Sequence, residues 1–332
     1  ETGRMIVIRF AVIGTSTITR NFLTVAAEVP RLQFAGAYSR SLERAKAFGA
    51  EYGARLAFNS LDALAEDERV DAVYIASPNA FHSEQAVRLL RAGKHVLCEK
   101  PAASNRREWD AMETAAQEGG AVLLEAMRSV FAPGFARLQE LLPRLGAIRQ
   151  ASFVFCQYSS RYDNFKRGVI ENAFRPELSN GALMDIGVYC VYPMAALFGL
   201  PAQVKADAVF LENGVDGAGS ALASYTDKQV LLRYSKINDD AGESEICGEN
   251  SCLRIDRIQD IRRLTFCPRV GIPEVIDVPT AENNMVYEAQ RFAGLIEAAA
   301  SCEPYTTWSR SSMAVLDNIR RQAGIVFPAD NA

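Results

Sequence analysis

The chain has 332 residues, 49% of them hydrophobic, and its 36 basic residues stand against 40 acidic ones for a formal net charge of -4. A chain of this length and composition can bury the cores of two domains. The nearly balanced charge, without any block of like charges, argues against nucleic acid or a membrane as a partner, so a small-molecule substrate is expected.

The cysteine content and the N-terminal segment indicate the cellular compartment of the protein. Seven scattered cysteines without a C-x-x-C pair, and only two histidines, predict free thiols and no metal site. No stretch approaches about 18 consecutive apolar residues, and the N-terminal segment lacks the pattern of a signal peptide. Free thiols are typical of a reducing cytosol, so a cytoplasmic location is expected.

The first third of the chain alternates short β-rich runs with helical patterns, which is typical of βαβ units. Strands are expected at residues 6–13, 32–38, 70–76, 95–99 and 121–127. Helices are expected in between, near Ile18, after Ser41, after Ser60, near Phe81 and after a cap at Ser104. The pattern predicts a Rossmann domain, a doubly wound parallel α/β sheet, over residues 5–128.

Beyond residue 128 the expected strands follow one another instead of alternating with helices. The expected elements are an amphipathic stretch at 131–145, a strand at 147–158, a helical run at 181–198, turns at 226–228 and 248–250, and helices at 283–300 and 307–323. Pro328 is expected to end regular structure. This pattern predicts an α+β domain over residues 129–332, with a large, mostly antiparallel sheet and helices on one face.

The loop after the first strand is a candidate cofactor site. Dinucleotide folds place G-x-G-x-x-G there, so that the backbone meets the pyrophosphate at the positive end of a helix. This chain keeps only the first glycine, and an ordinary strand-to-helix turn is the alternative. Its position and its hydroxyl groups favour a cofactor loop formed by Gly14, Thr15, Ser16, Thr17 and Ile18.

The end of the second strand bears on the choice of cofactor. NAD enzymes carry an acid for the ribose hydroxyls near this place, and here the chain has Ser39 and Arg40. A carboxylate would repel a 2′-phosphate, whereas Ser39, Arg40 and Arg44 can donate to one. NADP(H) is therefore favoured, and NAD(H) stays possible if the serines only cap the next helix.

Three further segments carry a family resemblance: Ile75–His82 (IASPNAFH), Ala92–Pro101 (AGKHVLCEKP) and Gly181–Tyr189 (GALMDIGVY). In this order and spacing they resemble the glucose-fructose oxidoreductase, inositol dehydrogenase and rhizopine-catabolism (Gfo/Idh/MocA) family. The resemblance implies that Lys100 lies beside the nicotinamide and that the second sheet carries the contacts of a homodimer or homotetramer. It adds to the expected cofactor-binding residues Ala76, Ser77, Pro78, Asn79, His82, Glu99 and Lys100.

One position distinguishes branches of that family. Members similar to inositol dehydrogenase carry a histidine where this chain has Tyr189. The glucose-fructose oxidoreductase and dimeric dihydrodiol dehydrogenase branches carry a tyrosine in a similar Asp-x-Gly-x-Tyr sequence. The chain is therefore expected nearer the second group, and inositol itself becomes a less favoured substrate.

Hydride transfer to or from a hydroxyl carbon requires a positioned acid/base. Asp185 and Tyr189 are four residues apart on a predicted helix and so share one face. We expect Tyr189 to exchange the proton, Lys100 to polarise the substrate oxygen, and Asp185 to orient the substrate or Lys100. A core tyrosine and a solvated or capping aspartate are the alternatives.

Three other residues are candidates for the active site, with less support from the sequence. His82 is expected to stabilise the turn after Ser77. Arg128, just past the fifth strand, and Tyr158, at the end of the long strand, are expected to contact the substrate in the cleft between the two domains. A surface salt bridge is the alternative for Arg128.

Together these features predict an NAD(P)-dependent oxidoreductase that moves a hydride between nicotinamide and a hydroxyl or carbonyl carbon of a sugar, sugar derivative or vicinal diol. Two alternatives remain open: a non-catalytic dinucleotide-binding regulator, and an NAD-dependent glycosidase that retains its cofactor. The presence of Lys100, Asp185 and Tyr189 together argues against the regulator, and the missing ribose acid argues against the glycosidase.

Overall fold

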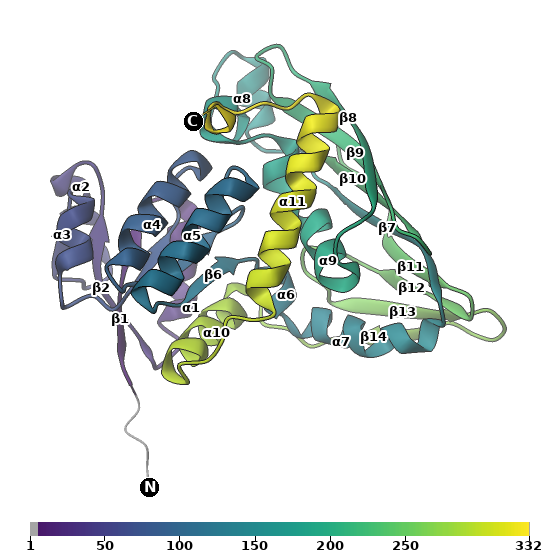
Figure 1. The fold of residues 1–332 in the computed structure, drawn as a ribbon, viewed down its shortest axis with the longest axis horizontal. Helices are drawn as coiled ribbons and strands as arrows, with labels where there is room; N and C mark the ends of the chain where they lie inside the picture. The colour runs from purple at the N-terminus through teal and green to yellow at the C-terminus, as the bar shows by residue number, and fades with distance from the viewer. Residues whose placement is uncertain (1–5, 332) are drawn as a thin grey trace, which may run out of the picture. The chain divides into compact units, whose positions relative to one another are not determined.

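A computed structural model of the protein describes residues 6–331, which form two compact units (Figure 1). One unit contains the chain to Ala126 and Ala281–Thr307; the other contains Met127–Thr280 and the chain from Trp308. The sequence alone divides the chain after residue 128, and its expected domain start at Met5 lies outside the described residues. Residues 281–307 join the first unit because helix α10 (Met285–Glu297) contacts helix α1 (Thr17–Ala26).

The first unit is built on a parallel sheet in the order β3-β2-β1-β4-β5-β6. The strands are β1 (Ile8–Ile13), β2 (Leu32–Tyr38), β3 (Leu56–Phe58), β4 (Ala72–Ile75), β5 (His95–Glu99) and β6 (Leu123–Ala126). Strand order reverses beside β1, which pairs with both β2 and β4. Ligands of such sheets bind outside the carboxyl ends of the strands at this reversal. The predicted Rossmann fold is confirmed.

Strand β3 is the one strand of this sheet that the sequence analysis missed. Its three residues, Leu56–Phe58, are too short to show an alternating pattern, and they pair with Gly36–Tyr38 at the edge of the sheet. The five predicted strands are all present, and their observed ends lie within two residues of the expected ones.

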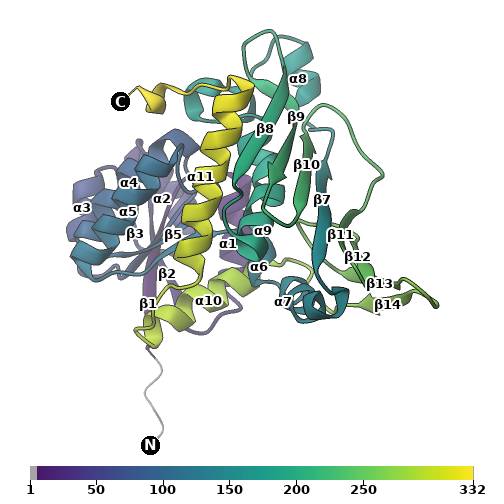
Figure 2. The ribbon, with the colours of Figure 1, turned by 45° about the vertical axis from the view of Figure 1, so that its right-hand side comes forward.

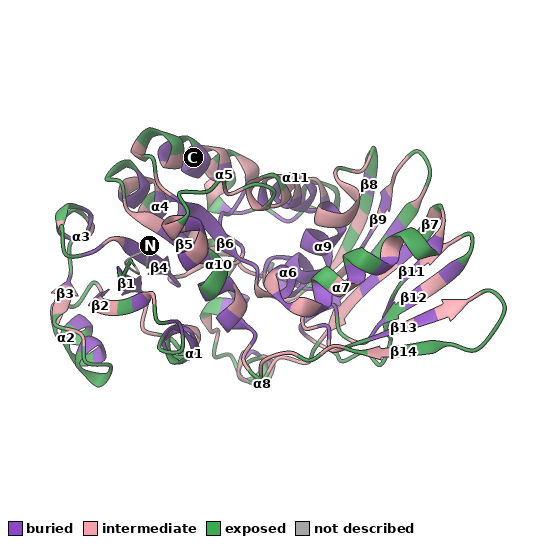
Figure 3. Ribbon diagram, turned by 90° about the horizontal axis from the view of Figure 1, so that it is seen from below, coloured by how far each residue is buried: buried purple, intermediate pink, exposed green. Residues whose placement is uncertain are grey.

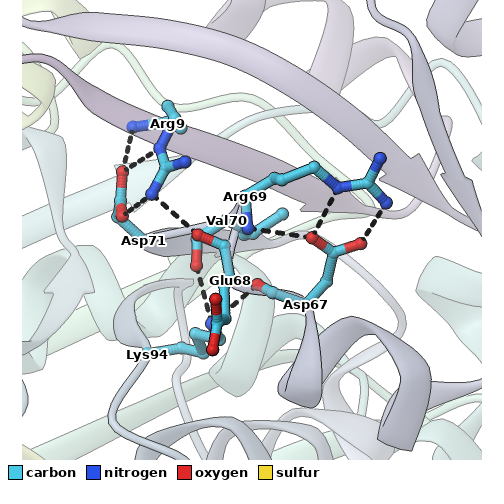
Figure 4. A network of polar contacts seen from close by, with 7 residues as sticks. All are labelled: Arg9, Asp67, Glu68, Arg69, Val70, Asp71 and Lys94. Carbon is cyan, nitrogen blue, oxygen red and sulfur yellow. Dashed lines mark hydrogen bonds and ion pairs between the residues drawn. The ribbon is translucent and has the colours of Figure 1, made fainter.

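The amino ends of these strands are closed by a polar network (Figure 4). Arg9 donates to both carboxylate oxygens of Asp71, at 2.9 and 2.6 Å, and Lys94 donates to the backbone carbonyls of Asp67 and Val70. Such bidentate pairing fixes geometry. The network holds the start of β4 to β1, at the edge opposite the one where ligands are expected.

Four helices of the first unit follow the predicted starts: α2 (Leu42–Glu51), α3 (Leu61–Glu66), α4 (His82–Arg91) and α5 (Arg106–Gly119). The predicted cap of α5 at Ser104 is wrong by one residue. Asn105 Oδ1 accepts from the Glu108 N–H at 2.9 Å, and the Glu108 carboxylate accepts from the Ser104 N–H at 2.8 Å. Asparagine caps helices as well as serine does, so sequence preference alone does not separate the two positions.

The second unit contains a sheet in the order β14-β13-β12-β11-β7-β10-β9-β8. Its strands are β7 (Ile148–Cys156), β8 (Gln203–Phe210), β9 (Asp216–Ser224), β10 (Gln229–Ser235), β11 (Ser244–Gly248), β12 (Ser251–Ile255), β13 (Arg263–Pro268) and β14 (Glu274–Asp277). All neighbouring strands are antiparallel except β7 and β10. The predicted sheet, including hairpins at 226–228 and 248–250, is confirmed.

One face of this sheet is covered and the other is open. In β10, Val230, Leu232 and Tyr234 are fully buried, whereas Leu231 between them is 45% exposed. Helix α9 (Val188–Phe198) contacts β7 and β10 and lies on one side of the sheet (Figure 2). Alternating buried and exposed residues along the strands show the same division (Figure 3). The expectation of helices on one face is confirmed.

The remaining helices differ in detail from the prediction. The stretch at 131–145 is divided into α6 (Arg128–Phe131), α7 (Pro133–Leu141) and a 3₁₀ turn, because Pro133 disfavours helical backbone at Ala132. Helices α8 (Tyr162–Lys166) and α11 (Tyr305–Ala323) complete the set, and a 3₁₀ turn at Pro328–Asp330 extends regular structure past the predicted end at Pro328.

The run at 181–198 consists of a π-helical turn, Leu183–Gly187, that continues directly into α9. An 18-residue window within Pro176–Phe198 has a mean hydropathy of 1.5, enough for a membrane span, but 72% of that window is buried inside the fold. It is therefore explained as a core helix. π-Turns within helices occur frequently at functional sites, and this one carries Asp185.

Candidate active site

Gly14 follows β1 at the carboxyl edge of the first sheet. Its φ of 100° is one that residues with side chains rarely adopt, and a Cβ atom there would lie 2.5 Å from the Ala76 carbonyl oxygen. The Ala76 N–H donates to the Ile13 carbonyl at 2.8 Å, so the loops after β1 and β4 are held together. Only glycine fits here, because the backbone at Gly14 passes directly against the Ala76 carbonyl.

The segment after Gly14 leads into α1. Ser16 occupies the N-cap position, but its side chain does not cap the helix, and Ser16 and Thr17 are both exposed. The first turn of α1 contains no acidic residue. Backbone N–H groups and two hydroxyls at the positive end of a helix fit the pyrophosphate of a dinucleotide.

The residues expected around a 2′-phosphate follow β2. Ser41, not Ser39, caps α2, since its Oγ accepts from the Arg44 N–H at 3.3 Å. Arg40 and Arg44 are exposed, and among residues 6–331 neither guanidinium has a hydrogen-bond or ion-pair partner. Their charges are therefore available to a phosphate.

His82 joins the loops after β4 and β5. The Nε2 atom of its buried ring lies 2.7 Å from the Ser77 carbonyl oxygen, and Nδ1 lies 3.0 Å from that of Pro101. Both partners accept, so a neutral ring satisfies only one of them at a time. Burial lowers the pKa of His82, despite both carbonyl contacts. The expected role at the turn after Ser77 is confirmed, and His82 also fixes Pro101.

Lys100 follows β5 at the same carboxyl edge and is half-buried, and its peptide bond to Pro101 is cis. The buried carboxylate of Glu99 accepts from the Tyr74 hydroxyl at 2.5 Å and from the Lys100 N–H at 3.2 Å. Burial and the Glu99 charge raise the pKa of Tyr74 well above its usual value. Glu99 thus holds the turn that presents Lys100.

In the second unit, Asp185 forms an ion pair with Lys236. The Lys236 ammonium lies 2.9 Å from Asp185 Oδ2 and donates to the Ala173 carbonyl at 2.6 Å. The lysine side chain is 2% exposed and that of Asp185 is 33% exposed. The carboxylate is therefore fixed from within the fold while part of its surface faces outward.

A second carboxylate, Asp216, holds the start of the same helical segment. Its Oδ2 accepts from the Leu183 N–H at 2.7 Å, and a Cβ atom on Gly181 would lie 1.8 Å from its Oδ1. Burial raises the pKa of Asp216 to about 7, although backbone N–H groups and Lys236 oppose this shift. Asp216 thus caps the turn that carries Asp185.

Gly187 explains the Asp-x-Gly-x-Tyr spacing in physical terms. A Cβ atom on Gly187 would lie 2.9 to 3.0 Å from ring atoms of Tyr234, which is fully buried in β10. The glycine therefore lets the helix approach the sheet, with Asp185 and Tyr189 two residues to either side.

Tyr189 is 6% exposed. Its ring meets that of Phe155 edge-on at 5.6 Å, and the Arg128 guanidinium lies 5.8 Å from its centroid. Arg128 and Tyr189, both predicted site residues, are thus neighbours. Tyr158 has different partners: its hydroxyl donates to Asp163 at 2.7 Å and accepts from Lys166 at 2.6 Å.

Two functional candidates were missed by the sequence analysis. Asp216 starts β9 and Lys236 follows β10, far along the chain from the motif that they support. A lysine directly after an apolar strand is an ordinary sequence feature, so only the strand pairing reveals its proximity to Asp185.

Two family descriptions match the chain. Residues 8–127 match the oxidoreductase family with an NAD-binding Rossmann fold, and residues 135–254 match the GFO/IDH/MocA C-terminal domain. The chain belongs to the Gfo/Idh/MocA family. The expected oxidoreductase with a nicotinamide dinucleotide on its Rossmann domain is thereby confirmed.

Several relatives are similar over nearly the whole chain. The scyllo-inositol 2-dehydrogenase (NADP(+)) IolU of Bacillus subtilis is 46% identical over 98% of this chain and 100% of its own. The trans-1,2-dihydrobenzene-1,2-diol dehydrogenase of Mus musculus is 31% identical over 97% of this chain and 99% of its own. Their names agree with an enzyme acting on CH–OH groups.

A solved structure shows the same fold. The 3-ketoreductase KijD10 of Actinomadura kijaniata, in complex with NADP and TDP-benzene, is 24% identical and covers 97% of this chain and 99% of its own, with a TM-score of 0.85.

One relative bears on the substrate expected from Tyr189. That tyrosine makes an inositol a less favoured substrate, whereas IolU, at 46% identity, is named for its action on scyllo-inositol. The substrate of this chain therefore stays a prediction. The name of IolU also agrees with the expected preference for NADP(H).

Proposed function

We propose that this protein is an NADP(H)-dependent dehydrogenase that oxidises a secondary hydroxyl of a ring polyol, such as an inositol, a cyclic sugar derivative or a vicinal diol. The observation that carries the proposal is a fixed, partly exposed carboxylate, Asp185, four residues before Tyr189. A hydrogen-bond acceptor beside an acid/base suits a substrate with adjacent hydroxyls. The similarity to IolU supports this substrate class.

The residues have separate tasks in the proposed mechanism. Bound nicotinamide supplies the hydride acceptor. Tyr189 exchanges the proton with the reacting oxygen, Lys100 stabilises negative charge on that oxygen, and Asp185 accepts a hydrogen bond from a neighbouring hydroxyl. Arg128 is proposed to contact the substrate beside Tyr189, with Tyr158 as a more distant contact.

The proposed cofactor contacts follow the loops of the first sheet. The Gly14–Ile18 loop and the start of α1 hold the pyrophosphate, and Ser39, Arg40 and Arg44 hold the 2′-phosphate. The Ala76–Asn79 segment lines the dinucleotide. His82 and Glu99 act by holding the turn around Lys100, since their polar atoms bind neighbouring residues of the fold.

We further propose a cytoplasmic homodimer or homotetramer assembled through the open face of the second sheet. Val209, Leu231 and Val275 expose 45% to 58% of their surface there. Apolar groups at such a face favour association. Light scattering should give a multiple of 36.4 kDa for the wild type and a smaller mass for Leu231→Glu; a wild-type monomer rules this assembly out.

A substrate screen tests the activity. Purified protein with NADP⁺ is supplied with scyllo-inositol, myo-inositol, aldoses and trans-diols, and absorbance of NADPH is followed. We expect reduction with at least one ring polyol, and slower turnover with NAD⁺. Absence of NADPH with every ring polyol, from protein that binds NADPH, would contradict the proposal.

A further inference from the structure

Lys236 has surroundings that point to a specific task. Its ammonium contacts Asp185 and the Ala173 carbonyl, and lies 4.6 Å from the centroid of the Phe174 ring. Its own N–H donates to the Gly217 carbonyl at 2.8 Å, so pairing with β9 fixes its backbone. A lysine this buried is rare and costly unless its charge is compensated.

The other titratable groups nearby are less suited to compensate that charge. Asp216 has a pKa of about 7 because of burial, so near neutral pH it is only partly ionised. Burial, together with Asp216, raises the pKa of Tyr234 far above neutrality, so the phenol stays uncharged. Asp185, at 2.9 Å and one-third exposed, is therefore the main ionic partner of Lys236.

We propose that Lys236 is a positioning residue, which keeps Asp185 ionised and in a fixed orientation for a substrate hydroxyl. The inference rests on the proposed function. An ionised carboxylate accepts a hydroxyl hydrogen bond more strongly than a protonated one. A nearby ammonium favours the ionised form, and its tether to Ala173 restricts where that carboxylate lies.

The matched variants are Lys236→Met and Lys228→Met. Methionine keeps much of the length of lysine without its charge. Lys228 precedes β10 as Lys236 follows it, pairs with Asp227 at 2.6 Å, and lies 5.3 Å from the Tyr225 ring centroid. We expect Lys236→Met to lower kcat/KM for the polyol about 10- to 100-fold, the loss typical of a charge-assisted hydrogen bond. Lys228→Met should remain within about twofold of the wild type.

A double-mutant cycle asks whether Lys236 acts through Asp185. If it does, Lys236→Met should add little to the loss already caused by Asp185→Asn. If the loss of kcat/KM in the double variant equals the product of the two single losses, the two residues act independently and the proposal is wrong. If Lys236→Met alone does not fold, the pair Asp185→Asn and Asp185→Asn/Lys236→Met still supplies the comparison, and Lys236→Arg should restore most of the activity.

Carboxyl ¹³C chemical shifts provide a readout that does not depend on activity. With labelled aspartate, and Asp185→Asn for assignment, Asp185 should stay ionised to lower pH in the wild type than in Lys236→Met. Identical titration, with unchanged kcat/KM, overturns the positioning role. If the wild type oxidises no ring polyol, the proposed function fails, and the ¹³C titration still decides whether Lys236 controls the charge of Asp185.

Discussion

Two contacts of Tyr189 are made by its ring and do not involve its hydroxyl. The ring packs against Phe155 and Arg128, and it is nearly buried. Tyr189→Phe should therefore keep the fold while removing the group that exchanges the proton. We expect kcat to fall about 10²- to 10⁴-fold, the range of a lost acid/base group, with the thermal midpoint unchanged. Stopped-flow and steady-state NADPH absorbance measure this loss, and a fall below fivefold contradicts the assigned role.

Arg40 tests the basis of the cofactor preference. It is exposed and has no ionic partner within residues 6–331, so its charge is free for a 2′-phosphate. Arg40→Ala should weaken NADPH binding about 10- to 100-fold and leave NADH binding nearly unchanged. Nicotinamide fluorescence titration measures both. Arg55→Ala is the control, because exposed Arg55 precedes β3 at the amino edge of the sheet. Equal losses for both cofactors would refute this assignment.

For individual site residues, sequence motifs were informative where the residues lie close together in the chain. Lys100, Asp185 and Tyr189 lie in short recognisable segments. Asp216 and Lys236 reach Asp185 and its helix only through pairing of β9 with β10, and no sequence spacing expresses that pairing.

The contact between the Asp185 helix and the sheet depends on Gly187. Gly187→Ala should destabilise the protein by about 1 to 3 kcal/mol, because the new methyl group meets the buried Tyr234 ring at 2.9 Å. Gly294→Ala is the control. Gly294 lies inside α10 with no atom within 4 Å of an added Cβ, so alanine should stabilise by about 0.5 to 1 kcal/mol. Urea unfolding measures both. Equal changes in the free energy of unfolding for the two variants would mean that the Tyr234 ring can move aside.

The Asp216 cap makes stability depend on pH. Its folded pKa of about 7 exceeds the ordinary value of 3.8, so the folded state binds this proton more tightly than the unfolded state. The free energy of unfolding that this bound proton contributes is fully present below about pH 4 and is lost as the pH rises through 7. The loss is at most about 1.4 kcal/mol per pH unit. Asp216→Asn should remove this decline. Parallel wild-type and variant curves of unfolding free energy between pH 5 and 8 would show that Asp216 does not titrate there.

Element boundaries were predictable where the local signal was strong. Strands β2 and β5 have the expected bounds because apolar runs and flanking polar residues define them. The three-residue β3 and the Asn105 cap were missed since neither gives a distinctive pattern. The π-turn at Leu183–Gly187 was missed because it keeps the apolar spacing of a helix while Asp216 holds its start.

Across the whole chain, the change from alternating to consecutive strands was enough to predict two different sheets. The strand order of the second sheet was not predictable, because the parallel pairing of β7 with β10 joins segments about 80 residues apart. The return of α10 to the first unit, through its contact with α1, likewise depends on packing between distant segments. Composition and motifs thus determined the fold class, and tertiary packing determined its arrangement.

The fate of hydrogen from the substrate tests the proposed oxidation most directly. scyllo-Inositol carrying deuterium on its ring carbons is incubated with the protein and NADP⁺, and the NADPH formed is analysed by mass spectrometry. We expect one deuterium to be transferred to each NADPH, with the rate greatly reduced in Tyr189→Phe. Failure of the wild type to form deuterated NADPH from this polyol, or from any ring polyol that it binds, would contradict the proposed hydride transfer.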